Sequence, residues 1–205
     1  MKYLIYILVA LVAYFIGSSN MALYLSKMRG IDMKNSGSGN LGASNSLVLM
    51  GWKAAILVAI HDIGKAVIAV LLAKHFFPEL VNIGAIAGVC TILGHIFPFY
   101  LKFRGGKGFA SYLGMTIALN WKFALIVLVM VVLITLITDY ISVATFTTIT
   151  VVPVYLGIAE HSILLASILF IATAAMYFKH RENIVRIANG TEIGFRRANR
   201  GDDRK

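Results

Sequence analysis

Seven apolar segments take up most of this chain of 205 residues, and they limit its fold more than any other feature. The segments lie at residues 3–25, 52–73, 80–101, 109–119, 123–138, 141–158 and 163–178. A helix needs about 20 apolar residues to cross a bilayer, and somewhat fewer where its ends are hydrated. Hydrophobic residues make up 59% of the chain and charged residues only 14%, which a water-soluble domain of this size could not bury. The sequence therefore predicts an all-α integral membrane protein with about seven transmembrane helices in one bundle.

The number and direction of the spans follow from the loops. The fourth and fifth segments are short and only Asn120-Trp121-Lys122 divides them, so six spans with a re-entrant fourth segment are the alternative. With seven spans, fifteen of the nineteen Lys and Arg residues fall on one side. Because cytoplasmic loops carry an excess of Lys and Arg, this side is predicted to be cytoplasmic and the amino terminus to lie outside. We expect one transmembrane domain over residues 1–192 and a basic, flexible cytoplasmic tail over 193–205.

Charge and cysteine content exclude several classes of protein. The net charge of +10 would suggest nucleic acid binding in a soluble protein, but here it is the charge excess of a membrane protein, and no nucleic acid partner is expected. The single cysteine, Cys90, excludes an intramolecular disulfide and a cysteine-based zinc site. No metal site or cofactor is predicted.

The loops on the predicted cytoplasmic side are rich in Gly, Ser, Asn and Lys, and three stretches indicate chemistry. The first is Asn-Ser-Gly-Ser-Gly-Asn-Leu-Gly-Ala-Ser-Asn at residues 35–45. Glycines let successive backbone N–H groups point inward, and a following helix adds its positive end, so phosphate binding is favoured over a flexible loop. The G-x-G-x-x-G within it is not a dinucleotide fingerprint, because no βαβ unit surrounds it.

The second stretch runs from Gly-His-Ile-Phe-Pro-Phe at residues 94–99 to Phe-Arg-Gly-Gly-Lys-Gly-Phe-Ala-Ser at 103–111. Gly-Gly-Lys-Gly at the entry to a helix suits phosphate binding, with Lys107 as a point charge, although it is not a Walker A motif. The third is Lys-His-Arg-Glu-Asn-Ile at residues 179–184, followed by Gly-Thr-Glu at 190–192. If this stretch is helical, His180 and Asn183 share one face. A solvated amphipathic tail is an equal alternative there.

Two charged residues lie inside the second apolar segment. Asp62 and Lys65 are three residues apart and can pair on one helix face. Charges within a membrane are costly and indicate function by default, but a structural ion pair is nearly as good an explanation. His95, beside Pro98, is assigned a structural role first.

Taken together and in this order, the three stretches resemble the bacterial acyl-phosphate:glycerol-3-phosphate acyltransferases. The resemblance covers nearly the whole chain, from the first apolar segment to about Glu192. It implies a seven-helix bundle in the cytoplasmic membrane with its active site at the cytoplasmic face. The implied reaction, the first step of phospholipid synthesis, transfers a fatty acyl group from acyl phosphate to the 1-hydroxyl of sn-glycerol 3-phosphate. The products are lysophosphatidic acid and phosphate, and a monomer is expected to be active.

The resemblance also implies roles for single residues. It gives a catalytic set, Ser38, Lys107, His180 and Asn183, and a set that binds substrate, Gly39, Asn40, Gly42, Ser44, Asn45, Gly105, Gly106, Gly108, Ser111, Ser142, Arg181 and Glu182. The family usually has Arg where this chain has Val48, which removes a phosphate ligand. The sequence leaves open whether His180 or the leaving phosphate accepts the hydroxyl proton. It also leaves two alternatives, a membrane transporter that uses Asp62 and Lys65, or an acyltransferase on this scaffold with another phosphorylated acceptor.

Overall fold

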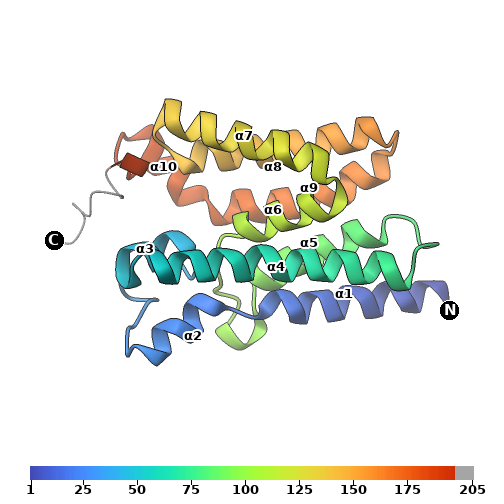
Figure 1. Ribbon diagram of the computed structural model, residues 1–205, viewed down its shortest axis with the longest axis horizontal. Helices are drawn as coiled ribbons and strands as arrows, with labels where there is room; N and C mark the ends of the chain where they lie inside the picture. The colour runs from blue at the N-terminus through green and yellow to red at the C-terminus, as the bar shows by residue number, and fades with distance from the viewer. Residues whose placement is uncertain (197–205) are drawn as a thin grey trace. The chain divides into compact units, whose positions relative to one another are not determined.

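The computed structural model describes residues 1–196, and in this range every regular element is a helix (Figure 1). The prediction of an all-α fold is confirmed. The elements are α1 Lys2–Ser18, α2 Met21–Met28, α3 Ala43–Met50, α4 Trp52–Phe76, α5 Ile83–Ile96, a 3-10 turn η1 at Phe99–Leu101, α6 Phe109–Leu119, α7 Trp121–Thr138, α8 Ile141–Ala159, α9 Ile163–Lys179 and α10 Arg181–Ala188. The chain forms two compact units, Met1–Leu119 (unit 1) and Asn120–Lys205 (unit 2). Of the tail predicted at residues 193–205, residues 197–205 lie outside the described part.

Each of the seven predicted segments contains a helix, but the helices differ in length. Five spans are long and apolar enough to cross a membrane: α1 with α2 (Lys2–Met28), α4, α5 with η1 (Ile83–Leu101), α7 and α8. A sixth is formed if α9 and α10, which meet at an angle of 55°, count as one span. α6 has 11 residues, which at about 1.5 Å per residue is short of the roughly 30 Å hydrocarbon core. The protein is therefore a multi-pass membrane protein, and the short fourth segment leaves six and seven spans both open.

Local side chains and glycines explain where the helices break. Asn120 caps α7 by accepting the N–H of Phe123 at 3.0 Å, which confirms the predicted break after α6. Asn20 caps α2 in the same way, through the N–H of Leu23 at 2.8 Å, and divides the first apolar segment into α1 and α2. Gly51, with a φ of 82°, separates α3 from α4. The 35–45 segment thus runs into the short helix α3, which includes its last three residues, rather than directly into the second span.

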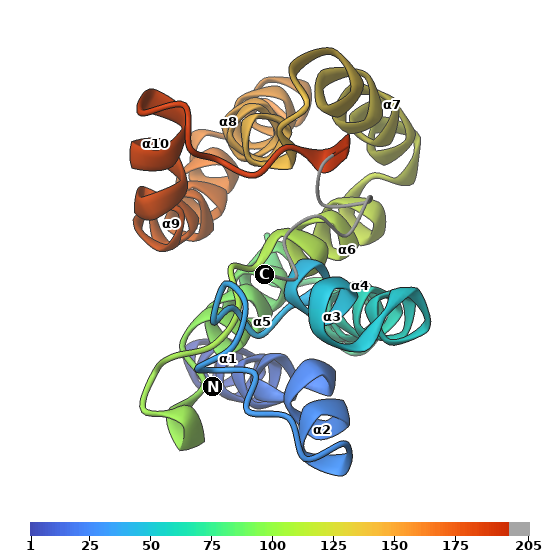
Figure 2. The same cartoon turned by 90° about the vertical axis from the view of Figure 1, so that its left-hand side faces the viewer.

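In unit 1, α4 and α5 pack against each other, with α1 on one side and α6 on the other (Figure 2). Glycines allow α1 and α5 to approach closely. A Cβ on Gly17 would overlap the backbone of Thr91, and a Cβ on Gly94 would overlap the backbone of Tyr14. Small residues commonly bring helices together in this way within membranes. The close contact fixes the end of α5, which leads into the second glycine-rich stretch.

In unit 2, α8 lies between α7 and α9 (Figure 2). Its buried face includes Ile149 and Val152, both 0% exposed, and the hydroxyl of Thr173 on α9 donates to the carbonyl oxygen of Ile149 at 2.7 Å. Helix α7 carries apolar side chains that are more than half exposed, such as Ile126 at 63%. An exposed apolar face of this kind suits contact with lipid.

Candidate functional site

The 35–45 loop is folded around the side chain of Asn45. This side chain, 2% exposed, donates from Nδ2 to the carbonyl oxygens of Met33 and Ser36 at 3.3 and 3.2 Å. Its Oδ1 accepts the N–H of Ser38 at 3.0 Å. Asn45, predicted to bind substrate, therefore holds two points of its own loop and one residue just before it.

The rest of the 35–45 loop presents small groups at the surface. Gly37 and Gly39 have φ values of 59° and 67°, which glycine adopts without strain. Ser38, Gly39 and Ser44 are exposed, and Asn40 is half-buried. Gly42 is buried and is the N-cap residue of α3. The loop thus leads backbone N–H groups into a helix start, which is the arrangement expected of an anion site.

The 105–108 loop (Gly-Gly-Lys-Gly) lies directly on the end of α5. The N–H groups of Gly105 and Gly106 donate to the carbonyl oxygens of Ile96 at 3.0 Å and of His95 at 3.1 Å. A Cβ on Gly106 would overlap His95 Nε2 and would lie 2.9 Å from the carbonyl oxygen of Leu41. Leu41 belongs to the 35–45 loop, so unit 1 brings its two glycine-rich segments into contact.

The 105–108 loop leads into α6. Gly108 has a φ of 92°, and the half-buried Lys107 precedes it. Ser111, in the first turn of α6, is 0% exposed and donates from Oγ to the carbonyl oxygen of Asp62 on α4 at 3.0 Å. This bond ties the start of α6 to α4. The bare backbone of the loop, with one lysine between glycines, can approach an anion closely.

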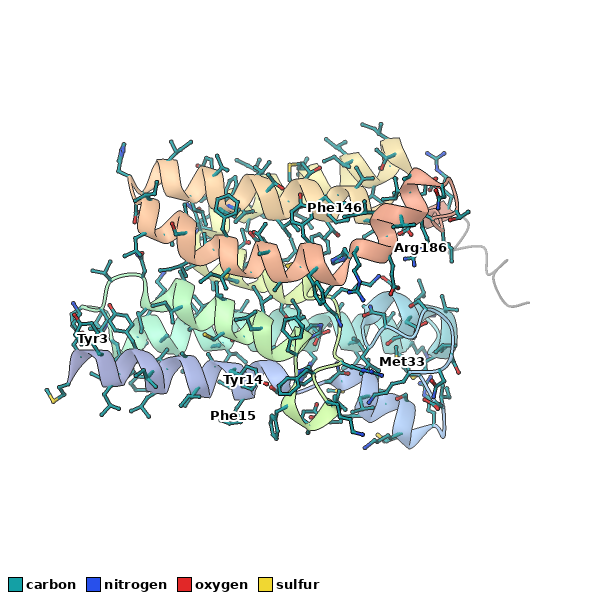
Figure 3. All side chains as sticks on the ribbon, turned by 180° about the vertical axis from the view of Figure 1, so that it is seen from behind. Tyr3, Tyr14, Phe15, Met33, Phe146 and Arg186 are labelled. Carbon is teal, nitrogen blue, oxygen red and sulfur yellow. The ribbon has the colours of Figure 1, made fainter. Side chains whose placement is uncertain are left out.

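Ser142, Asn183 and Glu192 form a hydrogen-bonded cluster in unit 2. Glu192 Oε1 accepts from Ser142 Oγ and from Asn183 Nδ2, both at 2.6 Å, and Asn183 Nδ2 also lies 3.0 Å from Ser142 Oγ. Glu192 Oε2 accepts from Nε of Arg186, which extends from α10, at 2.7 Å (Figure 3). The cluster joins α8 to α10 and to the segment that follows α10.

The carboxylate of Glu192 is held in its charged form. Burial alone raises the pKa of Glu192. The hydrogen bonds from Ser142, Asn183 and Arg186 and the positive charge of Arg186 lower it by more, so the pKa lies below the usual range. Glu192 accepts from all three donors and so sets their orientation.

His180 lies at the bend between α9 and α10, where it is both the last cap of one helix and the first cap of the next. The side chain is 4% exposed. Its Nδ1 lies 2.8 Å from the carbonyl oxygen of Met176, and its ring packs edge-on against Phe146, which Figure 3 labels on α8. Because a carbonyl oxygen can only accept, Nδ1 carries the proton in this contact.

The remaining predicted residues of this stretch lie outside the cluster. Arg181 is exposed, donates to the carbonyl oxygen of Phe178 at 3.0 Å and lies 4.6 Å from the centre of its ring. The side chain of Glu182 is 72% exposed and forms a long ion pair with Arg186 at 3.9 Å. Glu192, by contrast, was absent from the predicted site, although it stands in the Gly-Thr-Glu run of the same stretch.

The predicted pairing of Asp62 and Lys65 is confirmed, with 2.9 Å between Asp62 Oδ1 and Lys65 Nζ. Lys65 Nζ also contacts the carbonyl oxygen of Ser19 and Nδ1 of His95, both at 2.8 Å. Charges with partners inside the protein favour a structural pair over an ion path.

The structure thus places the predicted residues in two groups. Unit 1 holds those of the two glycine-rich loops, Ser38, Gly39, Asn40, Gly42, Ser44, Asn45, Gly105, Gly106, Lys107, Gly108 and Ser111. Unit 2 holds Ser142, His180, Arg181, Glu182 and Asn183.

Comparison with known proteins identifies relatives along nearly the whole chain. The family described as glycerol-3-phosphate acyltransferase matches residues 7–190. A protein of that name from Geotalea daltonii is 37% identical over 186 residues, which cover 90% of this chain and 95% of that protein. One from Thermoanaerobacter pseudethanolicus is 39% identical over 188 residues, which cover 91% of this chain and 93% of that protein.

Solved structures are similar over the same length. The crystal structure of PlsY (YgiH), an integral membrane glycerol 3-phosphate acyltransferase, in its glycerol 3-phosphate form has a TM-score of 0.87 and 31% identity, covering 93% of this chain and 95% of that chain. The lysophosphatidic acid form has a TM-score of 0.84 and 30% identity, covering 94% and 97%. The family predicted from the sequence is confirmed: this chain belongs to the glycerol-3-phosphate acyltransferase family.

Proposed function

We propose that this protein transfers a fatty acyl group from acyl phosphate to the 1-hydroxyl of sn-glycerol 3-phosphate. The observation that carries the proposal is the contact of two glycine-rich segments in unit 1, where Gly106 lies against the carbonyl oxygen of Leu41. Both proposed substrates carry a phosphate, and bare backbone next to a lysine is suited to bind one. The related PlsY structures, in glycerol 3-phosphate and lysophosphatidic acid forms, support this acceptor and product.

The proposed chemistry needs no acyl-enzyme, metal or cofactor, because acyl phosphate is an activated mixed anhydride. The 1-hydroxyl oxygen attacks the acyl carbon and forms the ester bond. The bond between that carbon and the phosphate oxygen breaks, and its electron pair leaves with inorganic phosphate. The protein then has to hold two anions in line and to stabilise the departing charge.

We assign the departing phosphate to the 105–108 loop. Gly105, Gly106, Gly108 and Ser111 are assigned to the acyl phosphate site, and Lys107 stabilises the developing charge. Because Gly105, Gly106 and Ser111 already donate to carbonyl oxygens of α5 and α4, their contribution is to shape the loop. The binding of the glycerol phosphate is assigned to the 35–45 loop, through Ser38, Gly39, Asn40, Gly42, Ser44 and Asn45. Because Asn45 is already bonded to its own loop, its contribution is to shape that loop.

In unit 2, His180 is the proposed general base. Its Nδ1 contacts the carbonyl oxygen of Met176, which fixes the ring, and Nε2 is assigned to take the hydroxyl proton. The leaving phosphate is the alternative acceptor of that proton. Ser142 and Asn183 remain proposed substrate-binding residues, and both donate to Glu192, which orients them. Arg181 and Glu182, both exposed, are also assigned to substrate binding.

The location of the enzyme follows from its charge distribution. We propose a cytoplasmic membrane protein with an external amino terminus and a cytoplasmic carboxyl terminus, active as a monomer. The family match over residues 7–190 supports one acyltransferase domain across residues 1–192. The active site then lies on the side of the membrane that carries fifteen Lys and Arg residues, which attract anionic substrates.

The test is product formation by the purified protein in detergent with palmitoyl phosphate and glycerol 3-phosphate. Mass spectrometry is expected to detect lysophosphatidic acid that depends on both substrates. Formation of an acylated product only with a different phosphorylated acceptor would contradict the acceptor assignment. No acylated product with any acceptor would contradict the proposed reaction as a whole.

A further inference from the structure

A group of charged and polar side chains lies buried in unit 1 beneath the 105–108 loop. It consists of Asp62 and Lys65 on α4 and His95 on α5, which are 2%, 5% and 4% exposed. His61, with its side chain 21% exposed, contacts Asp62 Oδ1 from Nδ1 at 3.2 Å. We call Asp62, Lys65 and His95 the buried network. Burying charged groups within a membrane protein costs free energy, and hydrogen-bond and ion-pair partners offset that cost.

The contacts of Lys65 determine how the histidine ring is used. A lysine ammonium has three protons, and three acceptors lie within reach: Asp62 Oδ1 at 2.9 Å, the Ser19 carbonyl oxygen and His95 Nδ1, both at 2.8 Å. With Nδ1 accepting from Lys65, the proton of the His95 ring is on Nε2. The longer separation of 3.4 Å between His95 Nδ1 and Asp62 Oδ1 agrees with this assignment.

The other side of the histidine ring faces the loop. His95 Nε2 and Cε1 lie where a side chain on Gly106 would be, and the carbonyl oxygen of His95 accepts the N–H of Gly106 at 3.1 Å. One residue therefore contacts the loop through both ring and backbone. From α4, the carbonyl oxygen of Asp62 accepts from Ser111 just beyond the loop at 3.0 Å. The buried network thus supports the loop at its beginning and at its end.

We propose that Asp62, Lys65 and His95 are positioning residues that fix the 105–108 loop and thereby place Lys107. This inference rests on the proposed function, since it assigns the network to the loop that binds the departing phosphate. Lys65 holds the ring of His95 in one orientation, and the ring in turn packs against Gly106. A misplacement of about 1 Å at a catalytic group can cost about 10²-fold in rate, so a small shift of the loop is sufficient to lower activity.

The main test is His95→Asn. The asparagine Oδ1 replaces Nδ1 as an acceptor for Lys65, but the shorter side chain loses the contact with Gly106. We expect kcat/KM for palmitoyl phosphate to fall about 10²-fold with a melting temperature close to that of the wild type. His95→Gln, whose side chain reaches the position of Nε2, should retain more activity. Thr91→Val is the matched control, because Thr91 is likewise buried on α5 and its hydroxyl donates within its own helix, to the carbonyl oxygen of Ala87.

A second variant removes the charges of Asp62 and Lys65 together, so that neither is left buried without its partner. The combined substitution Asp62→Leu with Lys65→Met replaces the pair by apolar side chains of similar size, which folded proteins often tolerate. Hydrogen exchange measured by mass spectrometry should then be faster in the peptide covering residues 96–111, as in His95→Asn, and unchanged in peptides from α1. A merely structural role predicts faster exchange throughout unit 1.

The exchange measurement does not depend on catalysis, so it separates this inference from the proposed function. Unchanged exchange in residues 96–111 in both variants would overturn the inference, whatever the activity. Wild-type kinetics in both variants, or equal losses in His95→Asn and His95→Gln, would also overturn it. If wild-type protein forms no lysophosphatidic acid, the proposed function fails, while localised faster exchange would still show that the network holds the loop.

Discussion

Replacing Glu192 by glutamine removes one negative charge from the cluster in unit 2 while keeping the size of the side chain. Oε1 accepts from Ser142 and Asn183, and Oε2 accepts from Arg186. A glutamine that keeps its carbonyl oxygen toward Ser142 and Asn183 turns its NH2 group toward Arg186. Two donors then face each other, and the two remaining bonds lose their charge assistance.

The size of the effect follows from these contacts. A hydrogen bond to a charged group contributes about 1.5–3 kcal/mol and one between neutral groups about 0.5–1.5 kcal/mol, so each retained bond loses about 1 kcal/mol. The side chain of Arg186 is 37% exposed, and the loss of its pair with Glu192 adds about 0–1 kcal/mol. We expect Glu192→Gln to lower the stability of unit 2 by about 2–3 kcal/mol.

The effect should depend on pH. Because the pKa of Glu192 is lowered in the folded protein, its contribution is complete above the ordinary pKa of about 4.3 and is lost as the pH falls through the lowered value. The difference in stability between wild type and Glu192→Gln should therefore be constant near neutral pH and become smaller as the pH falls below about 4.3.

The assay is thermal unfolding in detergent, followed by tryptophan fluorescence at several pH values. Glu160→Gln is the matched control, since Glu160 is an exposed glutamate at the other end of α8. Equal melting temperatures of the two variants at neutral pH would refute the argument. A difference from wild type that stays constant into acid would refute the part that depends on the charge.

Three further substitutions test the proposed substrate sites in unit 1. Lys107→Ala should lower kcat about 10²–10³-fold at an unchanged melting temperature, because a developing charge loses a fixed cation, and Lys122→Ala at the start of α7 should have no effect. Gly106→Ala should lower the free energy of unfolding by about 1–3 kcal/mol, because the added Cβ overlaps His95. Its control is Gly64→Ala in α4, where the added Cβ meets open space and the free energy of unfolding should be unchanged or higher. Val48→Arg should lower the KM for glycerol 3-phosphate about 10- to 150-fold and leave the KM for acyl phosphate nearly unchanged, because a charge-assisted bond is added. Steady-state kinetics and thermal unfolding measure all three.

Each of these predictions has a result that contradicts it. Wild-type turnover in Lys107→Ala removes the loop from the mechanism. Equal stability of Gly106→Ala and Gly64→Ala contradicts the tight contact at the loop. Lys53 stands five residues after Val48, at the start of α4. If Val48→Arg is neutral and Lys53→Ala raises the KM for glycerol 3-phosphate, Lys53 already binds the phosphate. If neither changes acceptor kinetics, the glycerol phosphate does not bind near α3 and the start of α4.

The helices were the most predictable part of the fold, because apolar length is the main requirement of a membrane helix. The break within the first segment was not predicted, since apolar residues continue on both sides of Asn20 and only its side-chain cap divides them. The break after Met50 depends on the backbone conformation of Gly51 rather than on a change in composition. Such breaks are local choices that hydropathy does not detect.

Candidate site residues could be proposed from the sequence where they lie within one short stretch. The glycines around Lys107 indicated an anion site, and the contact of Gly106 with Leu41 agrees with two adjoining loops. The role of Glu192 was missed because its partner Ser142 is 50 residues away in the sequence. The contact of His95 with Lys65 spans 30 residues and was missed for the same reason. Contacts at such distances depend on tertiary packing, which a single sequence does not reveal.

The central claim is direct acyl transfer from acyl phosphate to glycerol 3-phosphate. Its most direct test measures inorganic phosphate and lysophosphatidic acid together, with purified wild-type protein and either palmitoyl phosphate or palmitoyl-CoA as donor. The account predicts one phosphate released for each lysophosphatidic acid formed from palmitoyl phosphate, and no lysophosphatidic acid from palmitoyl-CoA. Lysophosphatidic acid formed from palmitoyl-CoA, or phosphate released from palmitoyl phosphate without glycerol 3-phosphate at the same rate, would contradict it.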